Sequence, residues 1–235
     1  MAGEGRGFRL RKDRREPMAK AVLFDCDGVL LDSEYQYLDS VSRYLRTLGR
    51  EAGIEELAYL VGTDIRRITE QLKKDYHLEG YGTEELIRGQ RALFYKEFYG
   101  EGKLSPMEGL VAFLDRLRAA GIRMAVASSS PQEYVDYVLG QLKIGEYFEF
   151  ALGRENVQRA KPAPDLYLEA MRRLKILPHE AVVIEDSQNG VAAGLASGAY
   201  VIAYKGSVVR QDTSGAHRTV FSFQEIGVEE LKKDL

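Results

Sequence analysis

The chain of 235 residues has a single cysteine, Cys26, and only three histidines. One cysteine cannot form an internal disulfide, and it argues against a zinc site built on cysteine ligands. The net charge of −3 provides no general attraction to nucleic acid or to anionic membranes. No apolar run approaches the roughly 20 residues that a membrane-spanning helix needs. These absences predict a soluble cytoplasmic protein with neither nucleic acid nor a membrane among its partners.

The N-terminal segment differs in composition from the rest of the chain. Residues 1–17 carry six basic against three acidic side chains and lack the apolar stretch of a secretory signal. We expect this segment to be a basic N-terminal extension without fixed structure, and we assign it no function.

Short apolar runs alternate with helical patterns along most of the chain. The runs are rich in valine, isoleucine and alanine, and some lack polar alternation, as in strands that are buried on both faces. The strands predicted in this way cover residues 20–24, 122–127, 148–153, 181–185 and 200–204. Strands that alternate with helices form parallel sheets with helices on both faces. The sequence therefore predicts an α/β fold with a doubly wound, Rossmann-like parallel sheet.

Two similar segments predict the starts of helices in this core. Residues 105–108, Ser-Pro-Met-Glu, combine a capping box with a proline at the first helical position. Residues 130–133 repeat this signal, and we therefore interpret Ser130 as a helix cap. A further helix of small residues is expected to begin near Ser187 and to end at Gly198.

Residues 34–104 break the alternation, because they show helical periodicity and no strand pattern. Tyr37, Val41 and Tyr44, for example, follow one another at spacings that place them on one helix face. A helical insert directly after the first strand is typical of a separate cap. We expect a helical cap domain at 34–104 and a core domain formed by 18–33 and 105–235.

Polar side chains follow four of the predicted strands at the points where the strands end. In a parallel sheet these ends lie along one edge, where ligands bind. The side chains brought to this edge are Asp25, Asp27 and Gly28, then Ser128, Ser129 and Ser130, then Lys161, and finally Glu185 and Asp186. Clustered carboxylates suit Mg²⁺, whereas lysine and serine hydroxyls suit a phosphate group. This combination predicts phosphoryl transfer assisted by Mg²⁺.

Asp25 and Asp27 lie one residue apart, so their like charges require an explanation. Three explanations are open for these residues alone: a turn that favours aspartate and glycine, a cation site, or a carboxylate that reacts. Cys26 lies between them, and we interpret it as a small buried side chain without a redox role. The motif DxDG by itself does not decide between the three.

Four segments together resemble the motifs of the haloacid dehalogenase-like superfamily. Their order and spacing are similar to those of its branch of small phosphatases and β-phosphoglucomutases with a helical cap. The resemblance covers almost the whole chain from Met18 onward. It rests on FDCDGVLLDS (24–33), the first serine of AVASSS (125–130), Lys161 of AKPAPDLYL (160–168) and VVIEDSQNGVAAGLASGA (182–199).

The resemblance implies a role for each matching residue. Asp25 would be the nucleophile that forms an aspartyl-phosphate, and Asp27 would be the general acid and then the general base. Mg²⁺ would be held by Asp25, Asp186 and the backbone carbonyl of Asp27, with Glu185 acting directly or through water. Lys161 would offset the charge on Asp25. The substrate would be bound by Gly28, Ser128, Ser129 and Lys161, and by cap residues among which Tyr37 and Arg66 are the main candidates, with Tyr35, Thr63 and Arg67 beside them.

Two positions bear on the choice between branches of the superfamily. The dehalogenases lack the second aspartate, so Asp27 disfavours that activity. β-Phosphoglucomutases carry a histidine at the position that aligns with Tyr37. We therefore favour an enzyme that hydrolyses a small phosphorylated metabolite, a sugar phosphate or phosphoglycolate, and that is a monomer or a weak dimer. A phosphomutase is the alternative. A non-catalytic binding module is the third hypothesis, although the motif residues show no defect.

Overall fold

The computed structural model describes residues 19–60, 65–100, 104–207 and 211–232. The predicted N-terminal extension and Thr63 lie outside these residues. In the described part of the chain, six parallel strands form one sheet in the order β3-β2-β1-β4-β5-β6. The strands are β1 (Ala21–Phe24), β2 (Arg123–Ala127), β3 (Ala151–Leu152), β4 (Ala181–Glu185), β5 (Tyr200–Tyr204) and β6 (Arg218–Val220). This is the order of a doubly wound sheet whose two halves meet at β1.

The predicted α/β class is confirmed. β1 and β2 each begin one residue later than predicted, and the larger differences concern the edges of the sheet. β4 and β5 have the predicted bounds, whereas β3 is shorter than the predicted run 148–153. β6 was not predicted, because its three residues, Arg218–Val220, include a single buried apolar side chain. Such a short edge strand lacks the apolar pattern that identifies a buried one.

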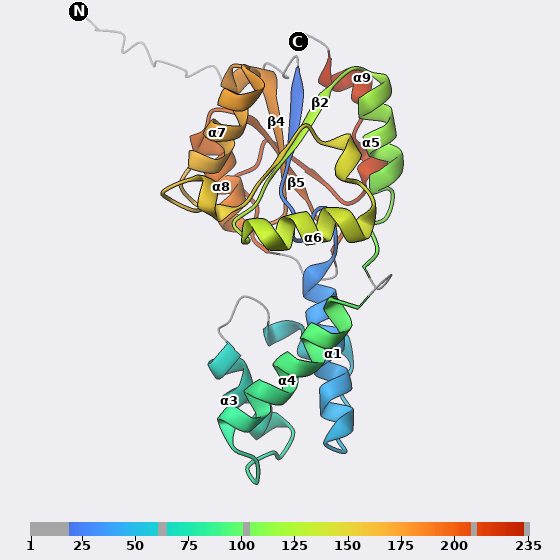
Figure 1. Cartoon of the computed structure of the whole chain (residues 1–235), viewed down its shortest axis with the longest axis vertical. Helices are drawn as coiled ribbons and strands as arrows, with labels where there is room; N and C mark the ends of the chain where they lie inside the picture. Colours follow the sequence, from blue (N-terminus) through green and yellow to red (C-terminus); the bar gives the residue numbers. More distant parts are fainter. Residues whose placement is uncertain (1–18, 61–64, 101–103, 208–210, 233–235) are drawn as a thin grey trace, which may run out of the picture.

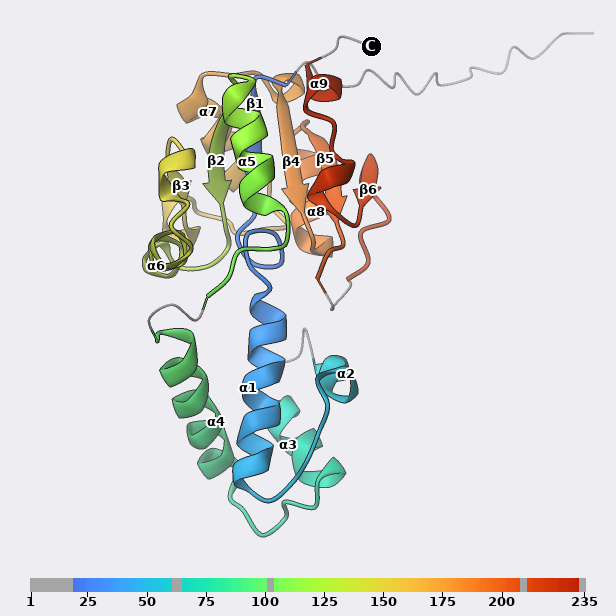
Figure 2. The same ribbon diagram turned by 90° about the vertical axis from the view of Figure 1, so that its right-hand side faces the viewer.

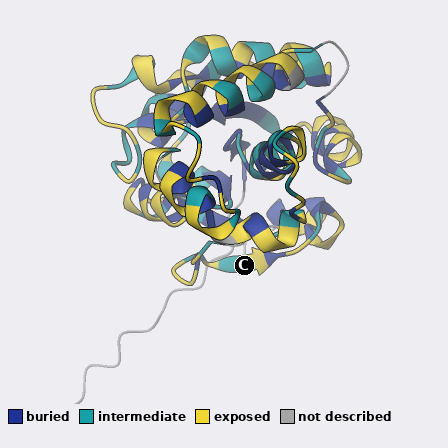
Figure 3. Ribbon diagram, turned by 90° about the horizontal axis from the view of Figure 1, so that it is seen from below, coloured by how far each residue is buried: buried dark blue, intermediate teal, exposed yellow. Residues whose placement is uncertain are grey.

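Alternate side chains of β1 point into two different apolar clusters, one on each face of the sheet. Val22 and Phe24 pack on one face, and Ala21 and Leu23 pack on the other. The first face is covered by α5 (Leu110–Ala119), α6 (Gln132–Leu142) and α9 (Val228–Leu231), and the second by α7 (Asp165–Leu174) and α8 (Gln188–Ala196) (Figures 1 and 2). Buried residues gather towards the middle of the molecule, and exposed ones lie on the outer helix faces (Figure 3).

The helix predicted to start at Ser105 begins later, at Leu110. The backbone N–H of Met107 donates a hydrogen bond to the carbonyl oxygen of Leu30, 2.8 Å away. This bond ties the segment to the loop after β1, so it does not form the first helical turn that its sequence favours. Gly109, with φ of 76°, precedes the helix instead, and the capping-box prediction at 105–108 is wrong.

Four helices lie together beyond the carboxyl ends of the strands (Figures 1 and 2). They are α1 (Ser33–Thr47), α2 (Ile54–Leu57), α3 (Ile65–Asp75) and α4 (Thr83–Phe98). Their apolar side chains, including Val41 of α1 and Leu72 of α3, form a cluster of their own. None of the helices in the described ranges combines the length and hydropathy needed to cross a bilayer.

We expect the Leu166→Ala variant to lower the free energy of unfolding by about 2–5 kcal/mol, because a fully buried leucine leaves a cavity when it is truncated. Leu168 lies on the same helix and is 42% exposed, so Leu168→Ala should cost less than about 0.5 kcal/mol. Urea unfolding of both variants measures the difference. Equal losses would contradict the assignment of the two faces of α7.

Candidate active site

Asp25 begins the site at the end of β1. Its backbone N–H donates to the carbonyl oxygen of Ile184 on β4 at 3.0 Å, which continues the sheet to the edge where its side chain is buried. The chain then turns at Gly28, which has φ of 71°, and the N–H of Gly28 donates to the carbonyl oxygen of Leu31. A positive φ at this position is readily adopted only by glycine. The turn therefore leaves both Asp25 and Asp27 at the edge of the sheet.

Lys161 bridges two carboxylates at this edge. Its Nζ donates to Asp25 Oδ1 and to Glu185 Oε1, both at 2.6 Å, and its side chain is only 4% exposed. Burial alone would lower the pKa of this lysine, but the two carboxylates raise it above its usual value. Lys161 therefore remains charged at neutral pH and offsets part of the negative charge of the site.

Glu185 is fully buried, and hydrogen bonds occupy both of its side-chain oxygens. Oε1 accepts from Lys161 and from the Tyr167 hydroxyl, and Oε2 accepts from the N–H of Asp186 and the Ser187 hydroxyl. A Cβ at Gly190 would lie 1.8 Å from the Cδ of Glu185, so only glycine fits there. Glu185 thus holds Lys161 in place. Sequence reasoning missed Tyr167, although it lies within the motif segment AKPAPDLYL (160–168), because only Lys161 of that segment was assigned a role.

Asp25, Glu185 and Asp186 form an acidic cluster in which one oxygen from each lies within 4.8 Å of the others. Burial and the charges of Glu185 and Asp27 raise the pKa of Asp25 to about 7, even though Lys161 opposes this shift. Burial and the charges of Asp25 and Glu185 raise the pKa of Asp186 to about 9. Carboxylates that resist ionisation in this way are stabilised by a cation, and an all-oxygen donor set fits a hard divalent ion.

Asp27 lies apart from this cluster and accepts two hydrogen bonds from hydroxyls. Oδ2 accepts from Ser130 Oγ at 2.7 Å, and Oδ1 accepts from the Tyr134 hydroxyl at 2.6 Å. The interpretation of Ser130 as a helix cap is therefore wrong. Pro131 occupies the cap position of α6, without a side-chain hydrogen bond, while the Ser130 hydroxyl turns towards the site. Tyr134 was not predicted, because its contact depends on the orientation of α6.

A cavity of about 420 Å³ opens over these groups. It is lined by the predicted residues Asp25, Asp27, Gly28, Ser128, Ser129, Lys161 and Asp186. Sequence reasoning missed further lining residues, among them Glu34, Asn189 and Gln211. Glu34 lies in the first turn of α1, and its pKa is raised to about 7 by burial and by the charges of Asp32 and Asp27. The structure thus brings the four motif segments together around one polar cavity.

The structure does not bring Tyr37 or Arg66 to this cavity. The Tyr37 hydroxyl accepts a hydrogen bond from Gln90 of α4 at 2.8 Å, and its ring packs against Phe94. Arg66 forms an ion pair with Glu84, and its side chain is 64% exposed. Tyr37 contributes to the packing between α1 and α4, and Arg66 links α3 to α4 at the surface. Substrate contacts of these two residues find no support in this geometry.

Cys26, which lies between the two aspartates in the sequence, is fully buried. Burial and the nearby charges of Asp27 and Asp25 raise the pKa of its thiol well above the usual value. The reactive thiolate is therefore suppressed. This agrees with the prediction of a small buried side chain.

The family model of haloacid dehalogenase-like hydrolases matches residues 22–204. The chain belongs to this family. Over 184 residues it is 31% identical to phosphoglycolate phosphatase 1 from Pseudomonas aeruginosa. The matched region covers 77% of this chain and 67% of the relative. It is 28% identical to the phosphorylated carbohydrates phosphatase of Thermotoga maritima, with 76% of this chain and 82% of the relative covered.

A solved structure carries the same fold. It is a haloacid dehalogenase family hydrolase from Deinococcus radiodurans with bound phosphate and sodium, and its TM-score is 0.77. It is 31% identical, and the match covers 89% of this chain and 93% of that one. The chain is thus an enzyme of a hydrolase family, as the motifs predicted.

Gly28→Ala is expected to weaken divalent-cation binding about tenfold or more, because a Cβ there would lie 1.9 Å from Asp186 Oδ2 and displace that carboxylate. Gly121→Ala is the matched control, since Gly121 has a similar φ of 72° and no atom within 4 Å of the added Cβ. Both variants carry the backbone cost of a positive φ. Calorimetric titration with Mg²⁺ separates them, and equal binding by the two would contradict the contact with Asp186.

In EDTA, we expect the free energy of unfolding to fall as the pH rises from about 4 towards about 9. The reason is that folded Asp25 and Asp186, with pKa values raised from 3.8 to about 7 and about 9, keep protons that the unfolded chain has lost. Asp186→Asn should flatten the upper part of this dependence. Urea unfolding at pH 5 and pH 8.5 measures it, and an unchanged slope in the variant would contradict the assignment.

Proposed function

We propose that the chain is a phosphatase that hydrolyses a small phosphomonoester of the sugar phosphate or phosphoglycolate type. One observation carries the proposal: the Asp25 carboxylate, held by Lys161, opens onto a polar cavity of about 420 Å³. A cavity of this size accommodates a small metabolite. The names of the two curated relatives point to the same class of substrate.

Asp25 is the proposed nucleophile. Its carboxylate attacks phosphorus, the ester oxygen leaves, and water later hydrolyses the aspartyl-phosphate. Lys161 is within hydrogen-bond distance of Asp25 and offsets its charge during the attack. Ser128, Ser129 and Gly28 line the cavity where the phosphoryl oxygens would bind.

Mg²⁺ would be held by Asp25, by Asp186 and by the backbone carbonyl of Asp27, and when bound it would neutralise charge on the phosphoryl group. Glu185 contributes through Lys161, because its own oxygens already accept hydrogen bonds. This assignment refines the expectation that Glu185 acts directly or through water.

Asp27 is the proposed proton-transfer group, first as the acid for the leaving oxygen and then as the base for water. The helices of the cap, residues 34–104 in our assignment, would close over the cavity and limit access of water. Among the described residues of 34–104, Glu34 lines the cavity, and we propose it, in place of Tyr37 and Arg66, as a contact for the rest of the substrate.

The proposal is tested by measuring phosphate release with Mg²⁺ from a panel of phosphoglycolate, hexose 6-phosphates and β-glucose 1-phosphate. Asp25→Asn should lower release by at least about a thousandfold, because the variant lacks the attacking carboxylate. Glu149→Gln is the control, since Glu149 pairs with Arg123 at the start of β2, the end of the strand opposite to the site, and should leave activity unchanged.

Two outcomes would contradict hydrolysis. Conversion of β-glucose 1-phosphate to glucose 6-phosphate after priming with a bisphosphate, without free phosphate, would identify a phosphomutase instead. Failure of every ester to react, with binding of phosphate retained, would favour a non-catalytic module.

A further inference from the structure

The two hydroxyls that bind Asp27 come from one short segment at the start of α6. Ser130 precedes the helix and donates to Oδ2, and Tyr134 lies in its first turn and donates to Oδ1. The backbone N–H of Ser130 also donates to Ser128 Oγ, which fixes the loop that carries it. A carboxylate whose two oxygens are both bound is held in a single orientation.

The Tyr134 hydroxyl is a persistent donor in this environment. Burial and the charge of Asp27 raise the pKa of Tyr134 far above the usual value for a tyrosine, so the proton stays on the phenol. The bond to Asp27 is therefore donated by Tyr134 at every pH at which the protein works. The other interactions of the ring determine where that donor lies.

The ring of Tyr134 stacks on Phe98, the last residue of cap helix α4. The ring centroids are 5.5 Å apart, and the interplanar angle is 10°. Phe98 is buried and packs with the core cluster, although it belongs to α4. The same aromatic ring system thus contacts the end of the cap and, through its hydroxyl, the proposed proton-transfer group.

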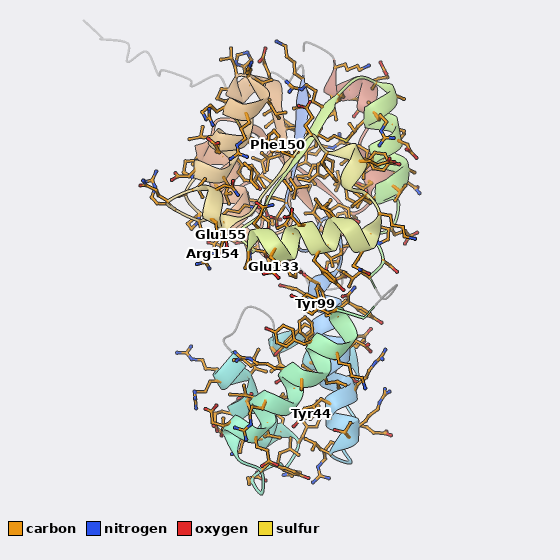
Figure 4. The ribbon with its side chains drawn as sticks, viewed as in Figure 1. Tyr44, Tyr99, Glu133, Phe150, Arg154 and Glu155 are labelled. Carbon is orange, nitrogen blue, oxygen red and sulfur yellow. The ribbon has the colours of Figure 1, made fainter. Side chains whose placement is uncertain are left out.

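Tyr137, one helical turn further along α6, contacts the same part of the cap without touching Asp27. Its hydroxyl donates to the backbone carbonyl of Phe98 at 3.0 Å, and its ring lies 4.6 Å from that of Tyr99. Figure 4 shows Tyr99 on the cap side of this junction and Glu133 of α6 on the core side. Both tyrosines of α6 therefore contact Phe98, but the hydroxyl of Tyr134 donates to Asp27 and that of Tyr137 donates to the backbone of the cap.

We propose that Tyr134 is a positioning residue for Asp27, and that its stack on Phe98 makes the orientation of this carboxylate depend on where the cap lies. The inference rests on the proposed function, because it assigns Asp27 to proton transfer. A shift of Phe98 would displace the ring that stacks on it, and with that ring the hydroxyl that donates to Oδ1. Closure of the cap and placement of the acid are then one event.

Tyr134→Phe removes the hydroxyl and keeps the stacked ring. A misplaced acid slows departure of an alkoxide, which needs a proton, far more than departure of nitrophenolate, which does not. We expect kcat/KM for the preferred alkyl phosphate to fall about tenfold or more, and kcat/KM for p-nitrophenyl phosphate to change less than about twofold. The ratio kcat/KM is the correct readout, because it covers only the steps up to the first irreversible one.

Tyr147→Phe is the control, because its hydroxyl donates to Asp115 of α5 at 2.6 Å, and it should leave the ratio of the two esters unchanged. Ser130→Ala removes the donor on the other oxygen and should shift the ratio in the same direction as Tyr134→Phe. It serves as the second test if Tyr134→Phe does not fold. If the wild type is active and Tyr134→Phe lowers kcat/KM equally for both esters, or if Tyr147→Phe changes the ratio as Tyr134→Phe does, this inference alone is overturned. A wild type inactive on both esters would overturn the proposed function and the inference with it.

Phe98→Leu tests the connection to the cap, since it keeps an apolar side chain and removes the stacked ring. It should lower the alkyl-to-aryl ratio as Tyr134→Phe does, by a smaller factor. A ratio equal to that of the wild type would overturn the connection to the cap and leave the assignment of Tyr134 in place.

Discussion

The paired contacts of Lys161 with Asp25 and Glu185 are the interaction on which the whole site depends. A buried charge is costly, and here one ammonium lies against two carboxylates with Asp186 next to them. Burial and the excess of negative charge raise the pKa values of Asp25 and Asp186, and carboxylates in this state would be stabilised by a bound cation. The arrangement therefore agrees with the proposed binding of a cation together with a phosphate ester.

The parallel sheet makes this arrangement possible. Asp25 and Lys161 are separated by 136 residues in the sequence, yet their side chains meet at the edge where β1 and its neighbours end. The same loop that carries Asp25 and Asp27 leads directly into α1, the first helix of the cap. Chemistry and cap are therefore joined by a very short stretch of backbone, and the stack of Tyr134 on Phe98 adds a second connection through side chains.

The sequence was sufficient to predict five of the six strands in the described part of the chain and the polar residues that follow them. β4 is an unbroken apolar run that ends in acids, so both its bounds and Glu185 could be identified without a structure. The start of α5 could not be predicted, because the segment around Met107 is held by a hydrogen bond to the backbone of Leu30, which is distant in the sequence. Local propensity favours a helix there, and a tertiary contact overrides it.

Side chains whose role depends on the orientation of a helix were the other failures. Tyr134 and Tyr167 reach the site only because α6 and α7 present one particular face. Tyr134 lies outside the four motif segments, and Tyr167 lies inside one of them without a role that the segment assigns to it. Tyr37 fails in the opposite sense, since its partner Gln90 lies 53 residues further along the chain. The motif residues escape this difficulty because the end of a strand determines their position directly.

The buried state of Cys26 has a practical consequence for studies of motion in this enzyme. Its thiol is the only one in the chain and is shielded from solvent, so maleimide dyes should not react with it under native conditions. One new cysteine on an exposed position of α4 and another on α7 would then accept a fluorescent pair without removal of any native residue. The chain is thus ready for single-molecule recording of the distance between cap and core during turnover.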